Sequence, residues 1–195
     1  MQVHKRLAIA ATAITMAGGL AAAVPAQANP PAAAAGAAAA QGARPAENAL
    51  RFPGTYRWLP EHFSGPCITA HGGVRKGAKV DQYRCVGAQN QKWYVEALDI
   101  YNAFRIHPAQ NMGLCVDIPG NYRNGTQLIL WNCNGRTNQS FHVNCGSRQR
   151  HCTIFPYSGD HHDKCLAVKG GKTANNTPLI LWRCNGARDQ KFTFR

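Results

Sequence analysis

Two side chains of opposite character stand close to a pair of cysteines in the middle of the chain. Asp117 follows Cys115 by two positions, and Trp131 precedes Cys133 by two positions. Side chains at i and i+2 of a β-strand lie on one face, so a bond between the cysteines would set the carboxylate and the indole on the same face. A carboxylate can accept hydrogen bonds from neighbouring hydroxyls, and an aromatic ring offers a flat apolar surface. The pair therefore has the chemistry needed to hold a sugar ring.

The elements that must position these residues are repeated three times. Starting at Cys67, Cys115 and Cys165, a second cysteine follows after 18, 18 and 19 positions. A short amide–aromatic phrase then returns each time, and a unit repeated at this period buries its apolar face against its neighbours. The three phrases are Asn90-Gln91-Lys92-Trp93, Asn138-Gln139-Ser140-Phe141 and Asp189-Gln190-Lys191-Phe192.

The outer repeats contain weaker versions of the arrangement in the middle repeat. In the first repeat Thr69 stands at the acid position, so a carboxylate would have to enter from Asp81 on the facing strand. In the last repeat Ala167 replaces the acid, and binding would depend on Asp189. The weaker candidates for a sugar site are Asp81, Tyr83, Asn90 and Gln91 in the first repeat, and Trp182, Asp189 and Gln190 in the last.

The glutamines and the aromatic residues of the repeated phrase are predicted to belong to the core. We expect the rings to pack at the threefold axis and the amides to satisfy buried backbone groups. Asn138 and Gln139 also stand where their amides can reach the rim beside Asp117, so the two roles overlap for Gln139. The predicted core positions are Gln91, Gln139, Gln190, Trp93, Phe141 and Phe192.

The repeated unit is predicted to consist of β-strands. Short apolar runs such as 129–131, 141–143 and 180–182 are bounded by Gly, Asn and Pro, which mark turns, and no helical stripe is present. Several short strands in each of three repeats favour an all-β, pseudo-threefold β-trefoil over a propeller, whose blades usually number four or more.

The motifs resemble those of the ricin B-chain-like (R-type) lectins over about Pro53 to Phe194. They are Cys-Val-Asp-Ile at 115–118, Leu-Trp-Asn-Cys at 130–133 and the Gln-x-Trp or Gln-x-Phe endings. The resemblance implies a β-trefoil that binds galactose-type or other glycans, through Asp117, Trp131, Asn138 and Gln139. One departure is Ile129, where many members have Gln, which removes a polar contact. Members occur alone, as targeting modules of secreted glycosidases, or as cell-binding parts of toxins.

The eight cysteines are predicted to form disulfides, as an even count in an exported chain indicates. Repeat symmetry and the resemblance together favour Cys67–Cys85, Cys115–Cys133 and Cys165–Cys184, with Cys145–Cys152 as the remaining pair. The sequence contains no Cys-x-x-Cys pair of the kind that binds zinc. The Asp-His-His-Asp run at 160–163 is interpreted as a solvated loop. We expect neither a cofactor nor a bound metal.

Residues 1–28 are predicted to be a signal peptide. A basic start at 4–6 precedes an alanine-rich apolar stretch, and small residues offer cleavage near Ala28. The prolines and the absence of apolar periodicity in residues 29–50 favour a linker or a propeptide. Residues 51–195 then form one folded unit, with repeats at about 51–98, 99–147 and 148–195. The mature chain is expected to be secreted and extracellular, and no later segment is apolar enough to span a membrane.

Charge and composition leave a binding protein as the favoured class. The net charge is +13, or +11 without Lys5 and Arg6 of the signal peptide, but the basic residues are scattered. Glutamates are scarce, and the aspartates do not suggest the facing carboxylates of a glycosidase. The favoured function is therefore a non-catalytic, carbohydrate-binding module with no nucleic-acid partner. The alternatives are a protein-interaction or delivery subunit for a separate toxin or enzyme, and a polyanion binder.

Overall fold

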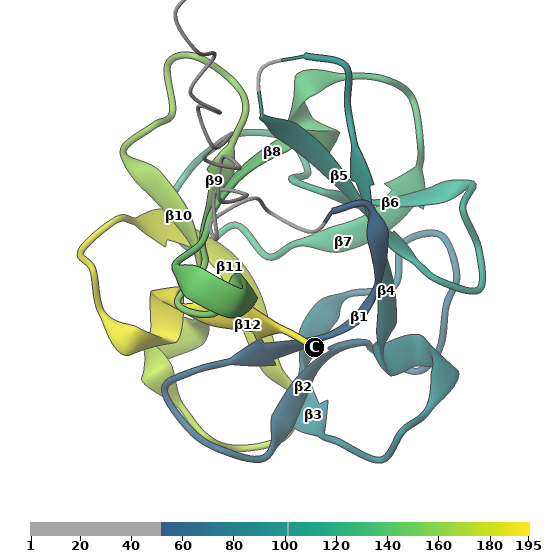
Figure 1. Ribbon diagram of the computed structural model, residues 1–195, viewed down its shortest axis with the longest axis vertical. Coiled ribbons are helices and arrows are strands. Elements are labelled where there is room, and N and C mark those ends of the chain that lie inside the picture. Colours follow the sequence, from purple (N-terminus) through teal and green to yellow (C-terminus); the bar gives the residue numbers. More distant parts are fainter. Residues whose placement is uncertain (1–51, 101) are drawn as a thin grey trace, which may run out of the picture. The chain divides into compact units, whose positions relative to one another are not determined.

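The computed structural model describes residues 52–100 and 102–195, which form short β-strands joined by tight turns and 3-10 helices (Figure 1). The predicted signal peptide and the predicted linker or propeptide lie outside the described residues. Within the described ranges no helix is long and apolar enough to cross a membrane. The strands fall into a barrel and three hairpins.

Six antiparallel strands make the barrel, in the order β12-β1-β4-β5-β8-β9. Cys152 and Phe192 close it by exchanging backbone hydrogen bonds of 2.8 and 2.9 Å between the two outer strands. Closure pairs the edges that an open sheet would leave exposed. The barrel strands are β1 Gly54–Pro60, β4 Lys92–Ala97, β5 Ala103–Pro108, β8 Phe141–Asn144, β9 Thr153–Pro156 and β12 Phe192–Phe194.

The other six strands pair as three hairpins, which Figure 1 shows spaced around the barrel. Each repeat therefore contributes four strands, of which the inner two form its hairpin. This arrangement is a β-trefoil, as the sequence predicts. The hairpin strands are β2 Pro66–Ala70 with β3 Val80–Arg84, β6 Leu114–Asp117 with β7 Ile129–Asn132, and β10 Lys164–Val168 with β11 Thr177–Arg183.

Aromatic rings fill the centre of the barrel. Trp93 is the second residue of β4, Phe141 and Phe192 are the first residues of β8 and β12, and all three are fully buried. The Trp58 ring lies 5.8 Å from Trp93 and 5.5 Å from Phe192 between ring centroids. The predicted core role of these rings is confirmed, and the edge-to-face contact between Trp58 and Trp93 adds to the stabilisation from burial.

The glutamines of the repeated phrase, Gln91, Gln139 and Gln190, are buried and fix the turn that follows each hairpin. Each ends a 3-10 helix, and its side-chain oxygen accepts the backbone N–H of Val86, Asn134 or Asn185 at 2.9 Å. Each side-chain nitrogen donates to the carbonyl of Arg84, Asn132 or Arg183 at 2.8–2.9 Å. The amides therefore satisfy backbone groups, as predicted. The helices are η1 Gln89–Gln91, η2 Thr137–Gln139 and η5 Arg188–Gln190, with η3 Ser147–Gln149 and η4 Lys169–Gly171 elsewhere.

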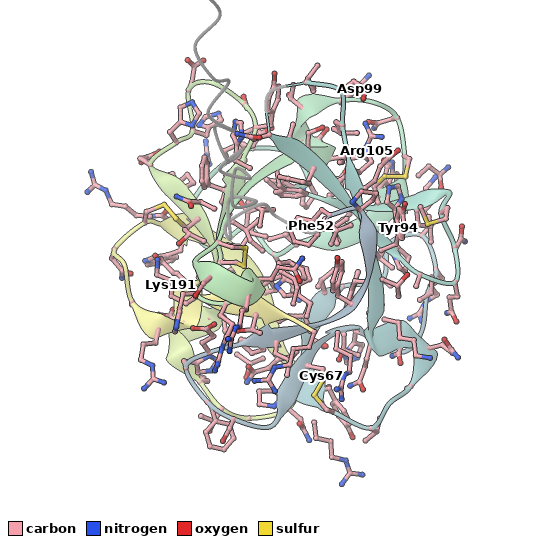
Figure 2. The ribbon with its side chains drawn as sticks, viewed as in Figure 1. Phe52, Cys67, Tyr94, Asp99, Arg105 and Lys191 are labelled. Carbon is pink, nitrogen blue, oxygen red and sulfur yellow. A yellow bond between two sulfur atoms is a disulfide. The ribbon has the colours of Figure 1, made fainter. Side chains whose placement is uncertain are left out.

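The four disulfides have the predicted pairings. Cys67–Cys85, Cys115–Cys133 and Cys165–Cys184 each tie a hairpin, and Cys145–Cys152 ties the β8–β9 connection. Figure 2 labels Cys67 with its yellow sulfur beside β2. A loop of the length closed in each hairpin contributes about 3 kcal/mol in the chain-entropy model. The hairpins that carry the candidate site are thus held at their open ends.

Each hairpin loop docks on the second strand of the next hairpin. The backbone N–H groups of Gly77, Gly125 and Asn176 donate to the carbonyls of Leu130, Leu181 and Gln82 at 2.7–2.8 Å. All three donors have a left-handed backbone, with φ of 78°, 87° and 60°, which glycine and asparagine tolerate best. Residues of one repeat therefore reach the site of the next.

Candidate functional site

The middle hairpin places Asp117 and Trp131 on one face. In the pairing of β6 with β7, Cys115 lies opposite Trp131 and Asp117 lies opposite Ile129. Directly opposed residues share a face, so the acid and the indole are diagonal neighbours on that face. Asp117 is only 4% exposed, whereas Trp131 is 39% exposed. The ring is therefore available to a ligand beside a carboxylate that is set into the surface.

The carboxylate of Asp117 is held through one of its oxygens. Oδ2 accepts hydrogen bonds from Asn138 Nδ2 at 2.9 Å and Gln139 Nε2 at 2.8 Å. Asn138 is itself held by Ile118. The Nδ2 of Asn138 also donates to the backbone carbonyl of Ile118 at 3.2 Å, and the backbone carbonyl of Asn138 accepts a hydrogen bond from the backbone N–H of Ile118. Oδ1 has no hydrogen-bond partner among the described residues. A fixed acceptor of this kind can receive a hydroxyl of a ligand.

Burial raises the pKa of Asp117 above its ordinary value, and the hydrogen bonds from Gln139 and Asn138 offset this only in part. A carboxylate removed from water disfavours its charged form unless donors replace the lost hydration. A further hydrogen-bond donor would therefore stabilise the charged form of Asp117. Perturbed acids of this kind gather at functional sites.

Lys76 covers one side of the exposed indole. Its Nζ lies 4.2 Å from the centroid of the Trp131 ring, within the range of a cation–π contact. Lys76 comes from the loop of the first hairpin, which the Gly77–Leu130 hydrogen bond holds against β7. A sugar must use the free face of the ring or displace the ammonium.

The first repeat contains a hollow of about 280 Å³ lined by the predicted weaker candidates Asp81, Tyr83, Asn90 and Gln91. Gln91 Nε2 donates to Thr69 Oγ1 at 3.1 Å, much as Gln139 donates to Asp117. Asp81 lies opposite Thr69, at the place that Ile129 holds in the middle repeat. The acid has thus moved to the facing strand, as the sequence suggests.

Asp81 is buried and only half satisfied. Its Oδ2 lies 2.5 Å from His71 Nδ1, while its Oδ1 is enclosed and has no hydrogen-bond partner among the described residues. Burial raises the pKa of Asp81, and the contact with His71 opposes that shift. A donor that reached this enclosed oxygen would satisfy it.

The last repeat keeps the ring but lacks a held acid. Trp182 is 43% exposed, whereas Ala167 is buried in the core at the acid position. Gln190 is buried, and its side-chain amide forms hydrogen bonds with the backbone of Asn185 and Arg183 in the turn. The Asp189 side chain has no hydrogen bond among the described residues, so nothing in the structure positions it as Asp117 is positioned.

Comparison with known families identifies the family of this chain. Residues 55–191 match the model of the ricin-type beta-trefoil lectin domain. The chain belongs to this family. A ricin-type lectin domain is a carbohydrate-binding module, and its threefold repeat is the one that carries Asp117 and Trp131 here.

Solved structures with the same fold include toxins, designed proteins and lectins. A mosquitocidal holotoxin matches with a TM-score of 0.64 at 20% identity, over 75% of this chain but only 17% of its own. The designed threefold-symmetric protein ThreeFoil has a TM-score of 0.61 at 20% identity, over 72% and 96%. The Macrolepiota procera ricin B-like lectin, solved with lactose, has 0.60 at 22%, over 74% and 96%. No curated protein sequence matches significantly.

Three residues beside these candidate sites were not predicted from the sequence. His71 contacts Asp81, Lys76 covers Trp131, and Asn176 lines the hollow of the first repeat. His71 stands two positions after Thr69, and that spacing could have placed it on the same face. Lys76 and Asn176 come from neighbouring repeats, and only the docking of the hairpin loops brings them to the sites.

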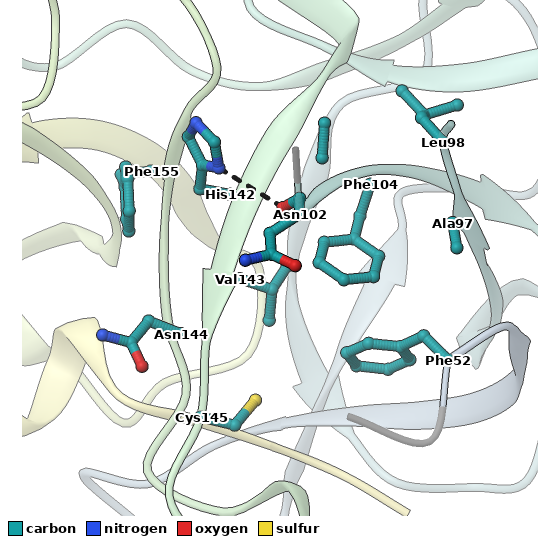
Figure 3. A pocket seen from close by; sticks show the side chains of 11 residues that line it. Phe52, Ala97, Leu98, Asn102, Phe104, His142, Val143, Asn144, Cys145 and Phe155 are labelled. Carbon is teal, nitrogen blue, oxygen red and sulfur yellow. Dashed lines mark hydrogen bonds between the residues drawn. The ribbon is translucent and has the colours of Figure 1, made fainter. Parts of the chain in front are cut away.

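The largest hollow that we describe, about 770 Å³, lies away from all of these candidates. Figure 3 shows Phe52, Phe104 and His142 around it, with the His142–Asn102 hydrogen bond of 3.3 Å. No carboxylate lines it, and none of the predicted sugar residues does. It lacks the acid and amide set of a ricin-type sugar site.

One group of side chains among the described residues has the spacing of metal ligands. His107 Nδ1 lies 3.7 Å from Cys115 Sγ and 3.6 Å from Cys133 Sγ. Both sulfurs belong to a disulfide, whereas a thiolate is the form that binds metal. His107 instead lies 3.0 Å from the Leu114 carbonyl and from Glu96, and it supports the hairpin.

Proposed function

We propose that this chain is a secreted, non-catalytic lectin module whose best sugar site is formed by Asp117, Trp131, Asn138 and Gln139. The observation that carries the proposal is the half-used carboxylate. Both amides hold one oxygen of Asp117, and the other has no partner among the described residues. Membership of the ricin-type family supports sugar binding as the purpose of this arrangement.

In the proposed complex, a sugar hydroxyl donates to Asp117 Oδ1 and the apolar face of the ring lies on Trp131. A hydrogen bond to a charged group contributes about 1.5–3 kcal/mol, so the carboxylate supplies the directional part of the affinity. Asn138 and Gln139 keep that carboxylate in one orientation before the sugar arrives. Galactose-type sugars are the first class to test, because the similar Macrolepiota procera lectin was solved with lactose.

The first-repeat hollow is the second site that we propose, with Asp81 in place of the missing acid. Shallow single sites bind weakly, and two sites on one domain raise retention on a repeated glycan. The middle and first hairpins each carry an aspartate, Asp117 and Asp81, whose pKa is raised by burial. The last repeat, with Ala167 at the acid position, is assigned a structural role.

The chemistry around Asp117 supports non-catalytic action at this site. Hydrolysis of a glycosidic bond needs two carboxylates that face each other across the bond. The side chains that hold the Asp117 carboxylate are amides. The disulfides favour an extracellular location.

Delivery of a separate toxin or enzyme subunit is the second candidate function. Its support is the structural similarity to the mosquitocidal holotoxin, in which the match covers 17% of the chain. Sugar binding and delivery are compatible, since a delivery module also needs a surface receptor.

A glycan array with wild type, Asp117→Ala and Asp160→Ala tests the main proposal. Asp160 is exposed and serves as the matched loss of one carboxylate. We expect the neutral glycans bound by wild type to be retained by Asp160→Ala and weakened at least tenfold by Asp117→Ala, with similar melting temperatures. If wild type binds no neutral glycan, or if both variants lose binding equally, the proposal is wrong.

A further inference from the structure

A hollow with a different chemistry lies apart from Asp117 and Trp131. The segment between β1 and β2 meets the β8–β9 connection and η5 around a hollow of about 510 Å³. None of the predicted sugar residues lines it. The lining residues that matter here are Glu61, His62, Phe63, Arg150, His151 and Arg188.

The carboxylate of Glu61 is fully used within the protein. Its Oε1 accepts the backbone N–H of His151 at 2.6 Å and the Thr193 hydroxyl, and its Oε2 lies 2.6 Å from His151 Nδ1. Burial alone would raise the pKa of Glu61, but the hydrogen bonds from Thr193 and His151 outweigh it and hold that pKa below its ordinary value. Both oxygens of Glu61 are therefore partnered by His151 and Thr193, and neither forms an ion pair with an arginine among the described residues.

Two guanidinium groups at this hollow retain open donors. Arg188 uses one N–H of Nη2, which donates to the Glu61 carbonyl at 3.1 Å. The Arg150 side chain has no hydrogen bond or ion pair within the described part of the chain. A guanidinium carries five N–H donors in a planar fork that matches a carboxylate or a similar oxyanion. The pair is suited to an anionic group.

The other side chains suit the sugar to which such a group would be attached. His62 Nε2 lies 2.9 Å from the Lys172 carbonyl and so donates to it, which leaves Nδ1 as an acceptor. That Nδ1 is enclosed and has no partner among the described residues, and a hydroxyl would satisfy it. Phe63 is 48% exposed and offers a flat apolar face.

We propose that this hollow binds an acidic sugar. Arg150 and Arg188 bind its carboxylate or sulfate, His62 accepts a hydroxyl, and Phe63 contacts the apolar face of the ring. A bare polyanion would use the arginines alone, whereas the unpartnered imidazole nitrogen and the exposed ring favour a saccharide. The site is separate from Asp117 and does not depend on the neutral-sugar proposal.

The test is calorimetric titration at fixed ionic strength with three probes. Trigalacturonate supplies carboxylates, a sulfated galactose oligosaccharide supplies sulfate, and galactotriose is the neutral reference. The protein variants are Arg150→Gln/Arg188→Gln and, as control, Lys79→Gln/Arg123→Gln, which removes the same charge from exposed positions outside the hollow. The responses to the first two probes distinguish a carboxylate from a sulfate ligand.

We expect at least one acidic probe to bind wild type more tightly than galactotriose does. Arg150→Gln/Arg188→Gln should weaken that binding about tenfold, and the control pair less than twofold. Equal losses in the two pairs would mean that net charge alone attracts the probe, and the proposal would be wrong. Absence of acidic-probe binding, or its loss in Asp117→Ala, would also overturn it. Thermal unfolding of each variant confirms that these exposed substitutions leave the fold intact.

Discussion

The glutamines of the repeated phrase allow structural and ligand-positioning roles to be measured separately. Gln190→Ala removes an amide that serves only the turn of the last repeat, with one bond to the Asn185 N–H and one to the Arg183 carbonyl. Gln139→Ala removes the same two bonds in the middle repeat and also the 2.8 Å bond to Asp117. The difference between the two variants reports on the third bond.

The expected magnitudes follow from these bonds. Each neutral hydrogen bond contributes about 0.5–1.5 kcal/mol, and the buried methylene lost on going to alanine adds about 0.8 kcal/mol. Gln190→Ala should therefore lower the free energy of unfolding by about 2–4 kcal/mol. Gln139→Ala should lower it by about 1.5–3 kcal/mol more, because its extra bond is to a buried carboxylate.

Urea unfolding followed by tryptophan fluorescence measures both values, and titration with lactose reports on the sugar site. Gln190→Ala should keep wild-type sugar affinity, whereas Gln139→Ala should lose it. Equal stability losses would refute a stabilising Gln139–Asp117 bond. A loss below about 0.5 kcal/mol in Gln190→Ala would refute the assigned role of the turn bonds.

Three further outcomes are expected. Burial raises the pKa of Asp117 above its ordinary value of 3.8, so sugar binding should already fall before the pH is lowered to 3.8, as titrations across pH 3.5–7.5 would show. The folded state holds this proton more tightly than the unfolded chain does. Protonation of Asp117 should therefore not itself destabilise the fold. Lys76→Ala should raise sugar affinity about two- to tenfold if the sugar uses the ring face of Trp131 now under the ammonium, and lower it by a similar factor if the ammonium contacts the sugar. An unchanged affinity would place the sugar on the free face of the ring or away from Trp131. Replacing Cys165 and Cys184 by alanine should cost about 3 kcal/mol in the same urea assay.

Much of the fold could be predicted because it depends on short sequence patterns that are repeated along the chain. The period of the cysteines fixes three units, and the amide–aromatic phrase places Trp93, Phe141 and Phe192 at the barrel strands. The same spacing put Asp117 and Trp131 on one face, since that relation depends only on strand alternation and one disulfide. These features are local in sequence or repeated, which makes them readable without a structure.

Contacts between repeats could not be predicted in the same way. Lys76 reaches Trp131 because the loop of the first hairpin bonds to β7, and no pattern along the chain encodes that docking. Arg150 and Arg188 meet around one hollow although 38 positions separate them. Their convergence depends on the closure of the barrel at Cys152 and Phe192.

The most direct test of the sugar site is a titration of isotope-labelled protein with lactose, followed by nuclear magnetic resonance. The proposal expects the largest shifts at the side-chain amides of Asn138 and Gln139 and at the Trp131 indole N–H. These shifts should saturate with one affinity and disappear in Asp117→Asn. Saturable shifts that avoid these groups, or that persist in Asp117→Asn, would contradict a sugar site at Asp117 and Trp131.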